Sequence, residues 1–212
     1  MVRPLEVQNL GVVPYAEALA LQHSLVDDLR NGAVSERLLF VEHPPVFTLG
    51  RKRTAAANVL QPGDTPVIQV ERGGDVTWHG PGQLVGYPIL ALQEAERDVH
   101  RVLRQLETAV VRVLALNGLT GMGGELHTGV WVEEKKVASV GVAIRDWVTF
   151  HGFALNVDPD LSWFRRINPC GLGSEVMTSM RALGVEEVDT TRLRLQLATE
   201  IADLFGRRLV AP

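Results

Sequence analysis

An alternating pattern in the second half of the chain constrains its fold more than any other feature of the sequence. Apolar and β-branched residues recur at every second position, in runs at residues 130–132, 137–144 and 148–157. Such alternation is typical of strands with one buried face. The segments Glu133-Glu134-Lys135 and Arg145-Asp146-Trp147 between the runs have the length of tight turns. The sequence therefore predicts three neighbouring strands joined by hairpin turns.

Other parts of the chain repeat apolar residues at helical spacing or form short apolar runs. The longest predicted helix covers residues 99–116, where Asp98 is placed to cap its start and Asn117-Gly118 to end it. His43-Pro44-Pro45 ends a strand, after which we expect a loop through Gly50 and Arg51. The predicted helices are residues 15–29, 99–116 and 189–207, and the further strands are residues 37–42, 66–71 and 84–92. Strand clusters interrupted by single helices indicate the α+β class.

Composition narrows the class of protein. The 212 residues are 46% hydrophobic and 22% charged, which is ordinary for a globular domain, so we expect a single domain over residues 1–212. A net charge of -4 provides no basic field for nucleic acid. No secretory signal and no apolar run near the roughly 20 residues of a membrane span is present, so we expect a cytoplasmic protein without a membrane partner. One cysteine and six scattered histidines show no metal-ligand spacing.

Residues 72–83, R-G-G-D-V-T-W-H-G-P-G-Q, form the most distinctive segment. Its glycines allow the backbone to approach a ligand closely, while Arg72, His79 and Gln83 supply polar groups. The spacing matches neither of the glycine-rich phosphate-binding motifs, G-x-G-x-x-G and G-x-x-x-x-G-K-[ST]. From the residues alone, the segment is either a ligand-enclosing loop or a glycine-rich turn with His79 in the core.

Two residues are candidates for covalent chemistry. Cys170, in N-P-C-G-L, lies between a proline and a glycine that fix a tight turn, where backbone N–H groups suit a developing oxyanion. Against this, an unpaired cysteine is as a rule a buried packing residue. Lys136, which opens K-V-A-S-V-G-V, is either a base whose pKa desolvation lowers or a solvated charge at a strand end. His151, in H-G-F-A-L-N-V, is either a functional residue or a histidine that packs in the core or on the face of the sheet.

Taken together, these segments resemble the lipoyl(octanoyl) transferases, also called octanoyl-carrier-protein:protein N-octanoyltransferases. The motifs that carry the resemblance follow the family's order and span nearly the whole chain. They are H-P-P-V-F-T-L-G-R, R-G-G-D-V-T-W-H-G-P-G-Q-L-V-G-Y-P, G-V-W-V, K-V-A-S-V-G-V, H-G-F-A-L-N-V and N-P-C-G-L. The family is similar in fold to the biotin and lipoate protein ligases, which implies a mixed β-sheet flanked by helices. This agrees with the α+β class predicted above.

The resemblance makes Cys170 the acyl-thioester nucleophile and Lys136 the group that lowers its pKa. Lys136 is preferred to Lys135 because it directly precedes V-A-S-V-G. The sequence departs from the family's pattern at two positions: Trp78 replaces a common tyrosine, and Leu172 replaces a common isoleucine. Neither residue is expected to contact a reacting atom. The predicted substrate-contacting residues are Arg72, Gly73, Gly74, Asp75, Val76, Thr77, Trp78, His79, Ser139, Val140, Gly141, Gly152, Phe153 and Ala154.

The resemblance also implies a reaction and its partners. An octanoyl (or lipoyl) group on the phosphopantetheine arm of acyl carrier protein passes to Cys170 and then to a lysine of a lipoyl domain. The acceptors implied are the E2 subunits of 2-oxoacid dehydrogenases and the glycine-cleavage H protein, in the first step of endogenous lipoate synthesis. Amide formation from a thioester is downhill, so we expect no ATP, no prosthetic group and no metal.

Three rival functions differ in the chemistry they need. An ATP-dependent lipoate or biotin ligase would use an acyl-adenylate, and Cys170 argues against it. A silent acyl-binding module would not need both reactive residues. A thiol hydrolase would need a histidine and a carboxylate, and none stands out by spacing. Transfer without ATP and analysis of the product would separate these functions.

Overall fold

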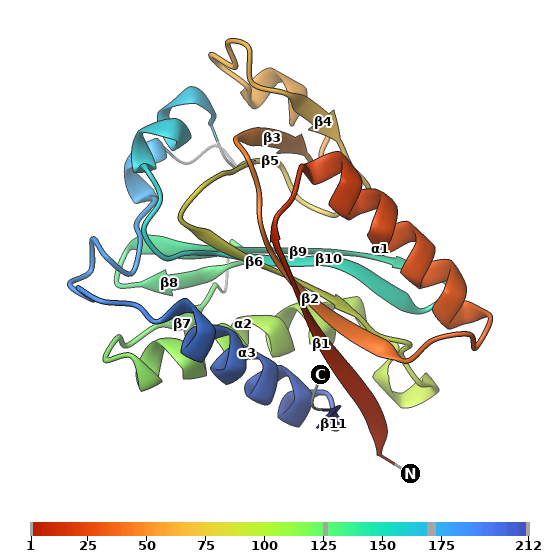
Figure 1. The fold of residues 1–212 in the computed structure, drawn as a ribbon. Helices are drawn as coiled ribbons and strands as arrows, with labels where there is room; N and C mark the ends of the chain where they lie inside the picture. The colour runs from red at the N-terminus through yellow and green to blue at the C-terminus, as the bar shows by residue number, and fades with distance from the viewer. Residues whose placement is uncertain (1, 125–126, 169–172, 211–212) are drawn as a thin grey trace.

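The computed structural model of the chain describes residues 2–124, 127–168 and 173–210. Its centre is a mixed sheet of eight strands in the order β11-β1-β2-β6-β10-β9-β8-β7, and a second sheet has the order β4-β3-β5 (Figure 1). The strands are β1 Arg3–Val12, β2 Glu36–Glu42, β3 Val46–Leu49, β4 Val67–Gln69, β5 Val76–His79, β6 Gln83–Ile89, β7 Met122–Gly123, β8 Val130–Val132, β9 Lys135–Arg145, β10 Val148–Asn156 and β11 Arg207–Val210. The α-helices are α1 Tyr15–Arg30, α2 Val99–Leu116 and α3 Thr190–Leu204. Short 3₁₀ turns are η1 Ala56–Asn58, η2 Glu94–Glu96, η3 Leu161–Arg166 and η5 Ser174–Val176.

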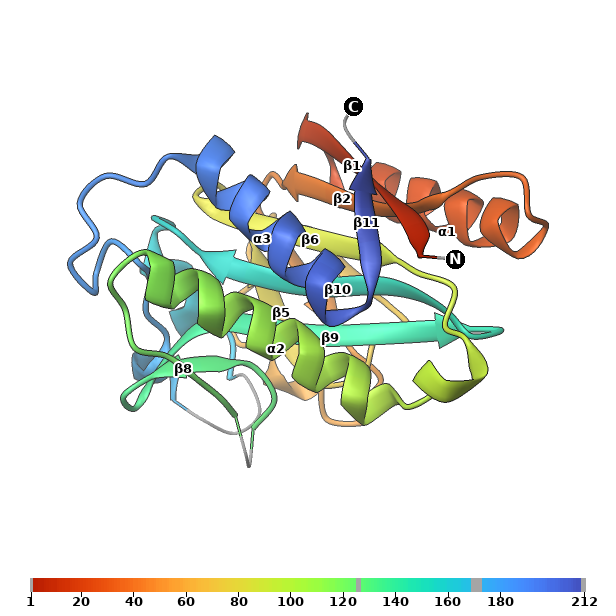
Figure 2. The same cartoon turned by 90° about the horizontal axis from the view of Figure 1, so that it is seen from below.

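The helices cover both faces of the large sheet. Helices α2 and α3 lie side by side on one face, whereas α1 and the small sheet lie on the other (Figures 1 and 2). Leu155 of β10 packs in one buried cluster with Leu197 of α3, and Ala154 packs in another with Val26 of α1. Adjacent residues of β10 thus point to opposite layers, as pleating requires. In the described part of the chain, no helix is long and apolar enough to cross a membrane.

The long periodic segments form the elements that the sequence predicts. Helix α2 has the predicted bounds, and the Asp98 carboxylate accepts hydrogen bonds from the N–H groups of His100 and Arg101. The β9–β10 hairpin closes through Asp146 and Trp147, whose φ angles of 47° and 63° are those of a type I′ turn. The predicted α+β class, with a mixed sheet flanked by helices, is confirmed.

Several predicted boundaries are wrong. The loop expected after His43-Pro44-Pro45 contains β3, and the glycine-rich segment contains β5; the two strands pair antiparallel. Strands β1 and β11, which pair in parallel, were not predicted either. The last helix ends at Leu204 and not near residue 207, because Gly206 takes a left-handed φ of 62° and the chain then enters β11.

Candidate active site

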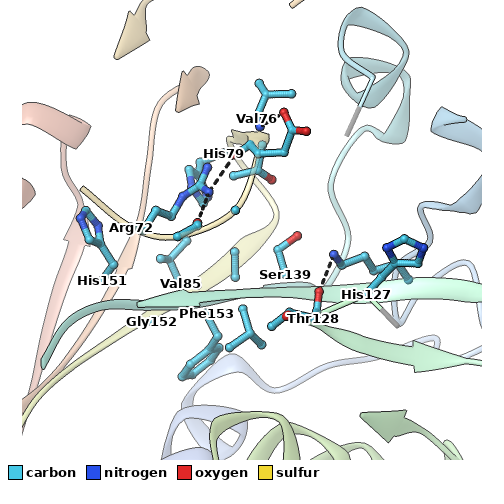
Figure 3. A pocket seen from close by; sticks show the side chains of 18 of the residues that line it. Arg72, Val76, His79, Val85, His127, Thr128, Ser139, His151, Gly152 and Phe153 are labelled. Atoms are coloured by element: carbon cyan, nitrogen blue, oxygen red, sulfur yellow. Dashed lines mark hydrogen bonds between the residues drawn. The ribbon is translucent and has the colours of Figure 1, made fainter. Parts of the chain in front are cut away.

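A cavity of about 240 Å³ lies between the large sheet and the small sheet (Figure 3). Strands β9 and β10 supply its floor, and β5 with the loop of residues 72–75 supplies the opposite wall. In Figure 3, His151 and Arg72 lie at one end of the cavity, Thr128 and His127 at the other, and Ser139 between them. The cavity is therefore elongated along the strands.

The structure gathers almost all of the predicted substrate-contacting residues around this cavity. Those that line it are Arg72, Gly73, Gly74, Asp75, Val76, Thr77, His79, Ser139, Val140, Gly141, Gly152, Phe153 and Ala154. Lys136 lines the same cavity. The segment of residues 72–79 thus meets residues 139–141 and 152–154, sixty or more positions further along the chain, at one site, and their contact with a substrate stays a prediction.

Small residues make the floor of the cavity open. Gly141 of β9 is the partner of Gly152 of β10, and Ser139 is the partner of Ala154. A Cβ atom on Gly152 would lie 2.2 Å from the carbonyl oxygen of Gly86 on β6, so only glycine fits that position. The pairing of two glycines leaves space above the sheet for a slender ligand.

Arg72 holds the glycine-rich loop in place. Its guanidinium donates hydrogen bonds to the carbonyl oxygens of Asp75 at 2.8 Å and Thr48 at 2.9 Å, and to the Thr48 hydroxyl at 3.0 Å. The loop in turn packs on β3, because a Cβ on Gly50 would lie 2.3 Å from the Gly74 carbonyl oxygen. Arg72 is only 8% exposed, so the guanidinium shapes the cavity wall by fixing the backbone of residues 72–75.

Trp78 is the one predicted contact that does not line the cavity. Side chains alternate along β5, so that Thr77 and His79 face the cavity while Trp78 points away. Its indole is buried and stacks on Trp163, with ring centroids 5.5 Å apart and an interplanar angle of 10°. Trp78 therefore lies apart from the other predicted contacts, in the core under the small sheet, and its contact with a substrate stays an untested prediction.

Lys136 projects into one end of the cavity. Its ammonium nitrogen donates a hydrogen bond to the Thr128 carbonyl oxygen at 2.8 Å and lies 5.7 Å from the centroid of the Trp131 ring. The neighbouring Lys135 is exposed and donates to the Glu175 carbonyl oxygen at 2.6 Å. Of these two adjacent lysines, only Lys136 presents its amine to the cavity.

Comparison with known proteins assigns the chain to a family. The sequence profile of the lipoyl protein ligase A/B catalytic domain matches residues 14–202. The chain belongs to this family. Within it, a protein of Syntrophotalea carbinolica named octanoyltransferase is 46% identical over 201 residues, covering 95% of this chain and 94% of that protein. A second octanoyltransferase, from Rubrobacter xylanophilus, is 49% identical over 211 residues, with the same coverage of 95% and 94%. The resemblance to octanoyltransferases, and with it the acyltransferase class, is confirmed.

Solved structures agree with this assignment at the level of the fold. A lipoate-protein ligase A bound with ATP superposes with a TM-score of 0.72 at 17% identity, covering all of this chain and 90% of the other. A biotin protein ligase from Aquifex aeolicus, in complex with biotin and ATP, gives 0.56 at 12% identity, with coverage of 94% and 69%. The predicted likeness to the biotin and lipoate ligases is thus confirmed for the fold.

Cys170 and Leu172 lie outside the residues that the structure describes. Phe164, which precedes them, and Val176, which follows them, line the cavity. The Asn168 N–H donates to the Asn58 carbonyl oxygen at 2.8 Å, and Met177 forms a β-bridge with Lys136 and lines the cavity. The role of Cys170 as a nucleophile stays a prediction.

A cluster of buried histidines and tyrosines lies at the other end of the cavity, where the sequence predicted Arg72 and His79 as substrate contacts and left the role of His151 open. Tyr15, His79, Tyr87 and His151 line the cavity, and His43 packs behind them. The His43 imidazole contacts the Val13 carbonyl oxygen through Nδ1 at 2.7 Å, so Nδ1 carries the proton, and Nε2 accepts from the Tyr87 hydroxyl at 2.8 Å. His43, His79, Tyr87 and His151 stand in the motifs quoted for the resemblance, whereas Tyr15 gave no signal in the sequence.

Burial keeps this cluster uncharged at neutral pH. Desolvation lowers the pKa of His43 to about 4, and desolvation together with the Arg72 charge lowers the pKa of His151 to about 4. Burial also lowers the pKa of His79 well below its ordinary value and raises the pKa of Tyr15 to about 12. The histidines and Tyr15 at this end of the cavity are therefore neutral at pH 7, and the positive charge there belongs to Arg72.

Proposed function

We propose that this chain is a cytoplasmic octanoyltransferase that moves an octanoyl group from acyl carrier protein to a lysine of a lipoyl domain. The observation that carries the proposal is the position of Lys136, whose amine enters a cavity with a floor of small residues in a member of the octanoyltransferase family. E2 subunits of 2-oxoacid dehydrogenases and the glycine-cleavage H protein are the acceptors we propose. The reaction would begin endogenous lipoate synthesis.

The first half-reaction forms a thioester on Cys170. The thiolate attacks the carbonyl carbon of the octanoyl-phosphopantetheine thioester, a new carbon–sulfur bond forms, and the pantetheine thiolate leaves. Lys136 takes the proton of the Cys170 thiol and returns it to the departing thiolate. The Thr128 carbonyl supports this role, because a hydrogen bond of 2.8 Å holds the Lys136 amine at the end of the cavity.

The second half-reaction releases the thioester to the acceptor. The lysine amine of the lipoyl domain attacks the carbonyl carbon, the Cys170 thiolate leaves, and Lys136 carries the proton from the amine to the thiolate. An amide replaces a thioester, so the step is downhill without nucleotide. No ATP enters the proposed reaction, and the chain needs no prosthetic group or metal for it.

The cavity suits a narrow acyl chain. Its volume of about 240 Å³ is just below the range of roughly 300–1,000 Å³ for pockets that hold drug-sized ligands. Gly141, Gly152 and Ala154 lie where the chain would pass. Each methylene removed from water stabilises the bound acyl group by about 0.8 kcal/mol, so eight carbons supply enough binding energy to hold the tail.

The test uses adjacent lysines as a matched pair. Wild type, Lys136→Ala and Lys135→Ala are mixed with octanoyl-carrier protein and a lipoyl domain, without ATP, and octanoylation of the domain is followed by mass spectrometry. We expect transfer by wild type and by Lys135→Ala, and a loss of roughly 10²–10⁴-fold in Lys136→Ala. Transfer that requires ATP would support a ligase instead. Free octanoate as the main product would support a hydrolase, and equal rates in the two variants would refute the role of Lys136.

A further inference from the structure

The cavity extends well beyond the length of an eight-carbon chain. Lys136 and Val142 are six residues apart on β9, and Val142 is the Cα partner of His151 on β10. At roughly 3.4 Å per residue in an antiparallel strand, the two ends lie about 20 Å apart. An extended acyl chain of eight carbons covers roughly 10 Å, given carbon–carbon bonds of about 1.5 Å in a zigzag. A chain that starts beside Lys136 therefore ends before it reaches His151.

The chemical character of the cavity changes along this length. Ser139, Gly141 and Ala154 line the middle, whereas the far end carries hydroxyl and imidazole groups. The Tyr15 hydroxyl lies 3.3 Å from Nδ1 of His151, and Nε2 of His151 lies 3.5 Å from Oε2 of Glu71, at the outer limit of hydrogen bonding. Both Tyr15 and His151 are buried, while Glu71 is half-exposed at the surface beyond them.

His151 is held in this position at a conformational cost. Its φ of 56° is left-handed, although it lies within strand β10. Successive strand residues ordinarily point to opposite faces, yet Phe150 packs in the cluster around α1 and His151 contacts Tyr15, the first residue of α1. The His151 N–H donates to the Gln22 side chain of α1 at 2.8 Å, which fixes the turned backbone. Backbone strain of this kind concentrates at functional sites.

The glycine-rich loop closes over the same point. The Gly73 N–H donates to the Val142 carbonyl oxygen at 3.2 Å, and a Cβ on Gly141 would lie 3.4 Å from Cδ of Arg72. The loop therefore crosses β9 where the small residues end and the polar cluster begins.

We propose that Tyr15, Glu71 and His151 form a polar end wall that sets the upper limit on the length of the acyl chain. A longer tail would press methylenes against buried polar groups and separate them from their partners, which is unfavourable. An octanoyl tail stops about 10 Å short of the wall, whereas a chain about eight carbons longer reaches it. This inference rests on the proposed octanoyl transfer and names the residues that restrict its substrate.

The test compares octanoyl-carrier protein and hexadecanoyl-carrier protein, whose tail of roughly 20 Å reaches the wall, as donors for wild type and three variants. His151→Gly removes the imidazole and accepts the left-handed backbone, and Tyr15→Phe removes only a hydroxyl. His127→Ala is the control, because this exposed histidine lines the opposite end of the cavity. We expect the hexadecanoyl-to-octanoyl ratio of kcat/KM to rise roughly tenfold in His151→Gly, since about two further methylenes gain burial. A smaller rise is expected in Tyr15→Phe and none in His127→Ala.

The outcomes separate the two proposals. If wild type transfers octanoyl and neither His151→Gly nor Tyr15→Phe changes the ratio, the end wall is refuted while the transfer stands. A rise in the ratio with His127→Ala as large as with His151→Gly would also refute it. If wild type transfers no octanoyl group, the proposed function itself fails.

Discussion

The substitution Gly129→Ala should move the amine of Lys136, the proposed base, while leaving the lysine itself in the protein. Gly129 precedes β8 with a φ of 136°, and a Cβ atom there would lie 2.4 Å from Cε of Lys136. Carbon atoms in contact are normally about 3.5–4.0 Å apart, so the lysine must move by more than about 1 Å. The same Cβ atom would lie 2.6 Å from the Ala138 carbonyl oxygen, so the backbone must shift as well, against the hydrogen bond of 2.7 Å from the Gly129 N–H to the buried Glu107 carboxylate.

The expected effect on catalysis is large because the proposed proton transfer depends on the position of Lys136. Moving its amine breaks the hydrogen bond of 2.8 Å to Thr128, and a displacement of about 1 Å can lower a rate by roughly 10²-fold. Strain at the left-handed backbone adds about 1–3 kcal/mol of destabilisation. The assay is single-turnover octanoyl transfer at 25 °C, with the free energy of unfolding measured in urea.

A matched control separates strain from displacement. Gly118 has a φ of 81°, also left-handed, but a Cβ there would meet nothing within 4 Å. Gly118→Ala should show the destabilisation of the left-handed backbone alone, without that of the steric clash, and leave the transfer rate unchanged. A folded Gly129→Ala protein with the wild-type rate would refute the reasoning that links this glycine to Lys136.

Three further predictions address the loop, the core and the buried histidines. Arg72→Lys loses the hydrogen bonds from the guanidinium to Thr48 and Asp75, so we expect slower transfer and a free energy of unfolding, measured with urea, that is lower by about 2–3 kcal/mol. An unchanged free energy of unfolding would contradict this. Trp78→Ala should cost about 3–5 kcal/mol in the same measurement while leaving the preference for chain length unchanged, because its ring packs away from the cavity; a changed preference would contradict it. The pKa of His43 is about 4 when folded and about 6.5 when unfolded, so the unfolded state binds more protons as the pH falls below 6.5. The free energy of unfolding should therefore fall by about 2 kcal/mol per such histidine from pH 7 to pH 5, and His43→Gln should lose part of this dependence.

Long periodic segments and tight turns could be predicted from the sequence because their signals are local. Asp98 and Asn117 mark the two ends of helix α2 in the sequence, and Asp146-Trp147 forms the turn between two strands of alternating apolar residues. Strand β3 could not be recognised in this way. All four of its residues are buried, so the run Val46–Leu49 shows no alternation, and two prolines before it suggested a loop.

The residues of the candidate site could be predicted only where they lie together in short sequence motifs. The glycine-rich segment and V-A-S-V-G meet at one cavity as expected. Tyr15 and Glu71 were missed because their contacts with His151 join residues 136 and 80 positions apart, which no local pattern reveals. Trp78 was predicted to contact the substrate because the resemblance was applied to every residue of the motif. Side chains alternate along strand β5, and that of Trp78 therefore packs in the core.

The central claim is that an octanoyl group rests on Cys170 between donor and acceptor, and its most direct test is a rapid-quench measurement of that intermediate. Wild type is mixed with octanoyl-carrier protein and a lipoyl domain without ATP, and the peptide that contains Cys170 is analysed by mass spectrometry over time. We expect one octanoyl group on this peptide, removable by hydroxylamine, which forms and decays at least as fast as the lipoyl domain is modified. Modification of the lipoyl domain with no acyl group on Cys170, or with one that turns over more slowly than product forms, would contradict the account.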